Sequence, residues 1–161
     1  MAWGRPPYEW ARERPEDQRY PPGMSTPHRL VDPAGIAPAV GFSHAVVAPP
    51  GRTVWIAGQI AVDAAGAVVG DTLVEQLDLA LANVVTALRA AGAEPRHAVS
   101  MLLFTTAMEE YRASRRALGP VYRRHFGRHF PAMALLGVTE LVEPAALVEV
   151  VTTAVIPDPA R

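Results

Sequence analysis

Hydrophobic and polar positions recur along this chain with periods that predict two helical regions set among short strands. Residues 72–91 carry leucine, valine and alanine at intervals of three and four, the spacing of one helix face. Thr72 and Glu75 have the spacing of a capping box, and Gly92 follows as the C′ residue. The pattern predicts a helix over 72–91 that covers one face of a sheet.

Short apolar and β-branched runs on both sides of this helix predict strands. Three runs precede the helix, at 28–32, 43–48 and 53–57, and one follows it at 98–107. The unbroken apolar run 101–104 is typical of a strand that is buried on both faces.

The region after residue 107 is predicted to be helical but interrupted. Thr106 and Glu109 repeat the capping-box spacing. The Gly119–Pro120 pair predicts a break, because proline within a helix loses a hydrogen bond and clashes with the preceding turn. We therefore expect two short helices, at 109–118 and 120–126.

Two apolar, β-branched runs near the C-terminus, 130–139 and 147–156, flank a proline-containing turn and predict a strand pair. Glu149 lies inside the second run, between Val148 and Val150. Its carboxylate must face solvent, find a partner or take part in chemistry, because burying it bare is costly. The order of the predicted elements indicates an α+β domain with the helices on one sheet face.

The domain is expected to span residues 28–157. Residues 1–27 combine prolines, charges and aromatic residues without periodicity, so we expect a disordered or extended leader. The alternative is a segment that docks through Trp3 or Trp10 on an apolar groove of its own or a neighbouring subunit. Residues 158–161 form a short tail.

Composition narrows the chemistry. The chain has no cysteine, and its 15 cationic side chains are all arginine, which excludes thiol and lysine Schiff-base catalysis. A formal charge of −1 gives no electrostatic case for a nucleic-acid partner. No apolar run reaches the roughly 18 residues of a membrane helix. We expect a cytoplasmic protein.

Two further patterns carry little chemistry. His125 and His129 have the spacing of a metal-binding pair, but Gly127 lies between them and no third ligand is evident, so no metal site is predicted. The arginine-rich stretch 112–128 has the charge to bind phosphate or RNA, yet acidic residues elsewhere in the chain balance that charge. A solvated helix face is the preferred interpretation.

Three blocks of sequence resemble the Rid family (YjgF, reactive-intermediate deaminases). They are residues 41–46 (GFSHAV), 55–60 (WIAGQI) and 146–150 (ALVEV). The family typically shows Gly-Pro-Tyr-Ser-Gln-Ala, Ser-Gly-Gln-Ile and Ala-Leu-Val-Glu-Ile at similar spacing. The resemblance covers about residues 28–156 and implies a chorismate-mutase-like fold, with sheets packed into the barrel of a homotrimer and ligand clefts between subunits.

The resemblance also implies an activity, the hydrolysis of enamines and imines to 2-oxo acids and ammonia. Glu149 matches the glutamate that positions or activates water, and the backbone at Gly58 matches a hydrogen-bond donor. An arginine that clamps the substrate carboxylate is replaced here by Met133. Methionine cannot hold a carboxylate as arginine does.

Other cleft positions that the resemblance implies are also less polar than usual. Phe42 occupies the position of a tyrosine in the family, and Gly119 lies near a position that is often asparagine there. Leu135 replaces a small or thiol-bearing residue. We expect a divergent enzyme without a cofactor that uses Glu149 for C=N hydrolysis, tautomerisation or cyclisation of a small, apolar, carboxylate-free substrate. The alternative is a non-catalytic trimer that binds a ligand or a partner protein.

Overall fold

The computed structural model describes residues 25–159 of the chain, so the expectations for residues 1–24 lie outside the described residues. The elements in chain order are β1 (Arg29–Val31), β2 (Ala45–Val47), β3 (Gly51–Gln59), α1 (Leu73–Ala90), the 3-10 turn η3 (Pro95–His97), β4 (Ala98–Thr105), α2 (Met108–Phe126), β5 (Ala132–Gly137) and β6 (Val148–Pro157).

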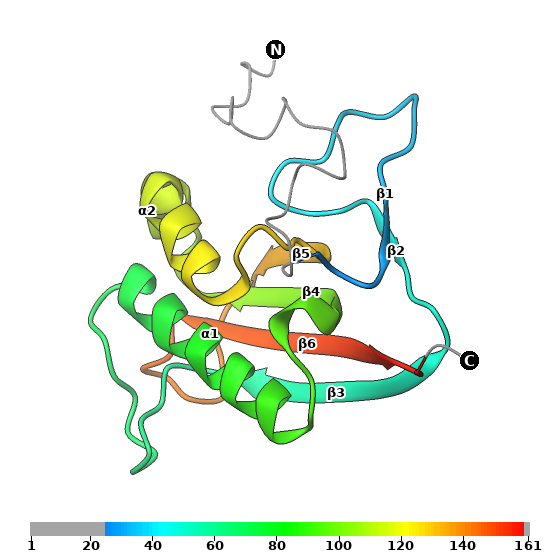
Figure 1. Ribbon diagram of the computed structural model, residues 1–161. Coiled ribbons are helices and arrows are strands. Elements are labelled where there is room, and N and C mark those ends of the chain that lie inside the picture. Colours follow the sequence, from blue (N-terminus) through cyan, green and yellow to red (C-terminus); the bar gives the residue numbers. More distant parts are fainter. Residues whose placement is uncertain (1–24, 160–161) are drawn as a thin grey trace.

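A four-stranded mixed sheet in the order β3-β6-β4-β5 forms the centre of the fold, and β1 pairs with β2 beside it. Strand β4 is antiparallel to β6 and parallel to β5. Both helices lie on the same face of this sheet, α1 across the strands and α2 beside it (Figure 1). The predicted α+β class with helices on one face is confirmed.

The predicted pairing of the two C-terminal runs is wrong. β5 and β6 both form strands, but β4 lies between them. The chain leaves β4, passes through α2 and returns as β5 parallel to β4, which places β5 at the sheet edge. Because β4 occupies the place between β6 and β5, the two C-terminal strands cannot form a hairpin.

The capping box at Thr72 and Glu75 is present, with both reciprocal hydrogen bonds, and Gly92 follows α1 with a φ of 78°. Helix α2 differs from its prediction. It is continuous through Pro120, and its N-cap is Ala107, without a capping side chain. Pro120 is exposed, so water can reach the Arg116 carbonyl that lacks a helical partner.

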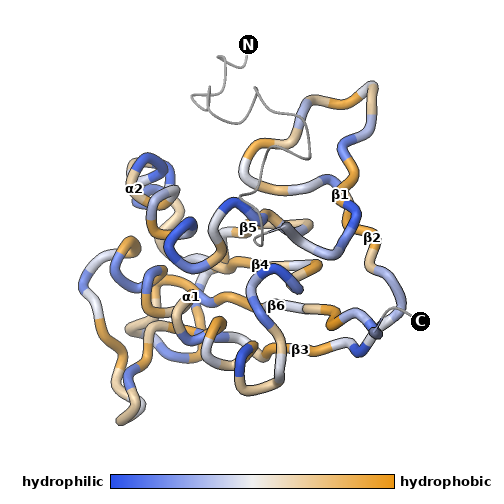
Figure 2. The backbone as a smooth tube through the Cα atoms, in the orientation of Figure 1, coloured by the Kyte–Doolittle hydropathy of each residue, from blue (hydrophilic) through white to orange (hydrophobic). Residues whose placement is uncertain are grey.

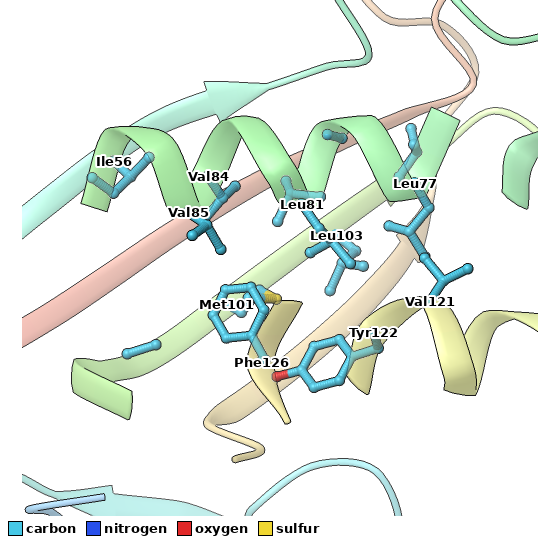
Figure 3. Close-up of a cluster of buried hydrophobic side chains, with 14 of the residues drawn as sticks. Ile56, Leu77, Leu81, Val84, Val85, Met101, Leu103, Val121, Tyr122 and Phe126 are labelled. Carbon is cyan, nitrogen blue, oxygen red and sulfur yellow. The ribbon is translucent and has the colours of Figure 1, made fainter. Parts of the chain in front are cut away.

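The core lies between the helices and one face of the sheet. Side chains from β3 and β4 meet those of α1 and α2, with Met101 and Leu103 buried beneath both helices (Figure 3). Figure 2 shows long hydrophilic stretches along α2, whereas β4 is mostly hydrophobic. Burial alternates along β6, where Val148 and Val150 are buried and Glu149 between them is half-buried.

The face of the sheet opposite the helices is apolar and open. It carries Trp55, which is 76% exposed, together with Leu102 and Leu136, at 38% and 44%. The prediction that the run 101–104 is buried on both faces therefore holds for one face within the single chain. No helix in the described part of the chain is long and apolar enough to cross a membrane.

Candidate functional site

Glu149 and Gly58 lie against each other. The ladder between β3 and β6 shifts register between Ile56 and Gln59, which is the bulge that a glycine at the end of a strand suggests. A Cβ atom placed on Gly58 would lie only 1.6 Å from Glu149 Oε1. The carboxylate therefore occupies the space that any side chain at position 58 would need.

The Glu149 carboxylate lies on the face of the sheet opposite the helices. Its register partner on β4 is Phe104, which in turn faces Leu136 on β5. Within residues 25–159, Glu149 takes part in no side-chain hydrogen bond or ion pair. The carbonyls of the bulge, by contrast, accept hydrogen bonds from Gln59 Nε2 at 3.1 and 3.2 Å. Glu149 is not used to stabilise the bulge.

A cavity of about 230 Å³ lies between α2 and the edge strand β5. It brings together four of the predicted binding residues: Phe42, Gly119, Met133 and Leu135. Phe42 is at its loop side and packs edge-on against the ring of His44, with centroids 5.1 Å apart. One chain alone therefore forms the pocket that these four residues were expected to line.

Sequence reasoning missed the helical wall of this pocket. Tyr111, Arg115, Gly119 and Arg123 recur at intervals of four along α2, and all four line the cavity. Residues four apart lie on one face of a helix. The spacing was visible in the sequence, but two separate helices predicted at 109–118 and 120–126 do not place Arg115 and Arg123 on one face.

The two groups of site residues do not meet within one chain. Leu135 is in register with Leu103, which is buried under the helices and lines the pocket. Glu149 is in register with the next residue of β4, Phe104. Adjacent residues of a strand point to opposite faces, so the carboxylate and the pocket lie on opposite sides of the sheet.

His125 and His129, which have the spacing of a metal-binding pair, make separate contacts. His125 Nε2 lies 2.6 Å from Asp78 Oδ1 on α1, and Arg124 also pairs with Asp78. His129 is buried, with Nε2 2.7 Å from the Ala98 carbonyl. No group of three metal-binding side chains occurs between residues 25 and 159.

A family profile described as Endoribonuclease L-PSP matches residues 33–156. The crystal structure of the Rid-family protein YyfB from Yersinia pestis, a protein of unknown function, is 34% identical and has a TM-score of 0.74. That match covers 81% of this chain and 100% of YyfB. The chain belongs to the Rid family.

Two other relatives show the range of names given to similar proteins. A goat (Capra hircus) protein named 2-iminobutanoate/2-iminopropanoate deaminase is 31% identical over 115 residues, which is 70% of this chain and 80% of the relative. A putative endoribonuclease from Thermotoga maritima is 31% identical with a TM-score of 0.59, over 78% of this chain and 92% of its own.

Proposed function

We propose that this chain is a divergent Rid enzyme in which Glu149 performs acid/base chemistry on a small molecule with a C=N bond. The observation that carries the proposal is the position of the carboxylate, packed against Gly58 and without a hydrogen-bond partner in residues 25–159. A glutamate kept only for structure would be expected to accept hydrogen bonds. One that acts on a substrate has to leave its oxygens available.

Hydrolysis of a C=N bond is the reaction we favour, since a 31% identical relative is named as an imine deaminase. In that reaction water adds to the imine carbon, and Glu149 accepts the proton that the water loses. Glu149 passes that proton to the nitrogen, which gives a carbinolamine. The hydroxyl proton of the carbinolamine is then transferred to the nitrogen by the same carboxylate, so that the C–N bond breaks, ammonia leaves and the carbon becomes a carbonyl. The Gly58 backbone N–H would donate to the developing negative charge. Tautomerisation or cyclisation needs the same proton transfers.

The site is proposed to be completed in a homotrimer. Within one chain Glu149 and the pocket lie on opposite faces of the sheet, so a molecule in the pocket needs the carboxylate of another subunit. Trp55, Leu102 and Leu136 form an exposed apolar face on the same side as Glu149. A closed threefold ring would bury this face and bring Glu149 of one subunit toward the pocket of the next.

Turnover by Glu149→Gln tests the catalytic proposal. Small imines generated in solution would be the substrates, and the release of ammonia above the uncatalysed rate would be measured. Because the amide keeps the shape but cannot accept the proton, we expect a loss of about 10²- to 10⁴-fold. Glu140→Gln, an exposed acid in the β5–β6 connection, is the matched control and should retain the wild-type rate.

Equal rates for wild type and Glu149→Gln would remove the catalytic role. If neither protein turned over any imine while both bound small molecules, the non-catalytic binding function would be supported instead.

A further inference from the structure

The pocket between α2 and β5 has an aromatic lining as well as an aliphatic one. Four aromatic side chains contribute to it: Phe42, Tyr111, Tyr122 and Phe130. Tyr122 stacks on Phe130 with ring centroids 4.9 Å apart, and its hydroxyl donates to the His129 carbonyl at 2.8 Å. Phe42 is 36% exposed, while Tyr111 and Phe130 are half-buried. The pocket therefore presents a preformed aromatic surface with one exposed edge.

Aromatic-lined grooves are a recurrent binding surface for proline-rich segments, which lose little conformational entropy when they dock. Residues 1–24, outside the described part of the chain, have this composition. They contain five of the 16 prolines of the chain, and two of its three tryptophans, Trp3 and Trp10. Prolines and aromatic residues are densest at 6–10, Pro-Pro-Tyr-Glu-Trp. The chain thus carries a segment with the chemistry that this pocket suits.

The point where this segment joins the domain is close to the pocket. Thr26 donates to the Arg96 carbonyl of η3 at 2.8 Å, and η3 contacts α2, which forms one wall of the pocket. The chain between Trp10 and Ser25 can span about 50 Å, whereas a domain of this size has a radius of gyration of about 14 Å. Docking within one chain has an effective concentration on the order of millimolar, so weak contacts are sufficient.

The charges of the pocket and the segment are complementary. The charged side chains in the described lining are Arg115 and Arg123, without an aspartate or glutamate. Residues 9–17 hold four acids and two arginines, which gives them a net charge of −2. Arg123 already takes part in an interaction, so we assign the pairing to Arg115 alone. Arg115 is exposed at the rim, where an acid next to a docked Trp10 can approach it.

We propose that residues 1–24 occupy the pocket of their own chain, with Pro6, Pro7 and Trp10 against its aromatic lining. The segment and a small molecule then compete for the same space, so the segment inhibits binding from within the chain. This contact goes beyond the proposed function, because it forms whether or not Glu149 acts on a substrate.

The ε-methyl group of Met133, which lines the pocket, reports its occupancy in NMR spectra of the full-length protein. An indole ring beside a methyl group shifts the methyl resonance, so Trp10→Ala should move the Met133 signal. Gln18→Ala, a polar change in the same segment, is the matched control and should leave that signal in place. The signal of Met101, which is fully buried in the core, should stay unchanged in both variants and shows that the domain is folded.

A peptide of residues 1–24 added in trans gives a second test. In wild type this peptide has to displace a segment whose effective concentration is on the order of millimolar. In Trp10→Ala the pocket is open, so the same peptide should bind at least about 10-fold more tightly. A scrambled peptide of equal composition controls for charge and hydrophobicity and should bind neither protein. Adding Phe42→Ala to Trp10→Ala should weaken binding of the native peptide, because one aromatic contact is removed.

Four outcomes would overturn the proposal. The Met133 signal could be the same in wild type and Trp10→Ala, or the native and scrambled peptides could bind equally. A change at the indole of Trp55 instead of Met133 would place the segment on the open sheet face. A Met133 signal that depends on protein concentration would assign the pocket to a second copy of the chain. None of these measurements involves turnover, so Glu149→Gln remains a separate test of the catalytic proposal.

Discussion

The carboxylate of Glu149 fills the space beside the Cα atom of Gly58, so that a methyl group at position 58 would lie 1.6 Å from Oε1. The two residues come from neighbouring strands, β3 and β6, at the point where their ladder is bulged. The glycine and the glutamate are thus a steric pair. One has to lack a side chain for the other to hold its position.

Gly58→Ala should displace the carboxylate and lower imine turnover toward that of Glu149→Gln. Overpacking of this kind usually costs about 1–3 kcal/mol in the free energy of unfolding. A double-mutant cycle measured by urea unfolding gives the control. In a Glu149→Ala background the obstructing atoms are gone, and Gly58→Ala should cost almost nothing. An equal cost in both backgrounds would show that the strain arises in the β3 backbone and not between the two residues.

Leu102→Asp should prevent assembly of the proposed trimer. Leu102 is 38% exposed and lies on the open sheet face, so an aspartate there leaves the single chain folded but places a charge in the expected interface. Light scattering should report a monomer, and imine turnover should be lost because Glu149 then has no pocket to face. Val142→Asp, a fully exposed apolar position in the β5–β6 connection, should remain assembled and active. A wild-type monomer with full turnover would contradict both the trimer and the shared site.

Acid should destabilise the fold through His129. Burial lowers the pKa of His129 to about 4, against the opposing hydrogen bond to the Ala98 carbonyl. Burial also lowers the pKa of His28 and of His97. Because a lowered pKa means that the unfolded chain binds the proton first, stability is full above about pH 6.5 and falls as the pH drops toward 4.

For His129 the loss is on the order of 3 kcal/mol across that window. Urea unfolding of wild type at pH 7, 6, 5 and 4 measures it. His129→Gln should flatten the dependence of the unfolding free energy on pH, since glutamine can still donate to Ala98 but does not titrate. The same slope in both proteins would assign the acid sensitivity to other groups.

Local patterns predicted the fold well where a single segment decides the outcome. Thr72 and Glu75 form their capping box, in which the threonine hydroxyl accepts from the Glu75 N–H at 3.3 Å and donates to the Glu75 carboxylate at 3.0 Å. Thr106 and Glu109 have the same spacing but do not form a capping box, since the N-cap of α2 is Ala107. The Thr106 hydroxyl lies 3.4 Å from the Ala146 carbonyl, to which it donates, in the turn before β6. That competition is tertiary and is not visible in the spacing.

Long-range pairing set the other limits of the sequence analysis. The apolar runs of β5 and β6 were recognisable, but whether they pair depends on β4, which is about 30 residues earlier in the chain than β5 and lies between the two strands. Glu149 and Gly58 were both named from the sequence, and the structure places them in contact. Arg123 was assigned to a solvated helix face, but it lines the pocket because α2 is continuous through Pro120. That continuity depends on packing of Leu118, Val121 and Tyr122 against the core, which the sequence pattern does not show.

The bulged glycine separates what can change in this site from what cannot. Replacing Gly58 or Glu149 disturbs a contact between two strands inside the sheet, whereas positions 119, 133 and 135 are half-buried on a helix face and an edge strand. These positions lie on the side of the sheet opposite the carboxylate. Ligand preference can therefore be redesigned at the pocket wall without moving the carboxylate, which makes this fold a convenient scaffold for engineering new specificities.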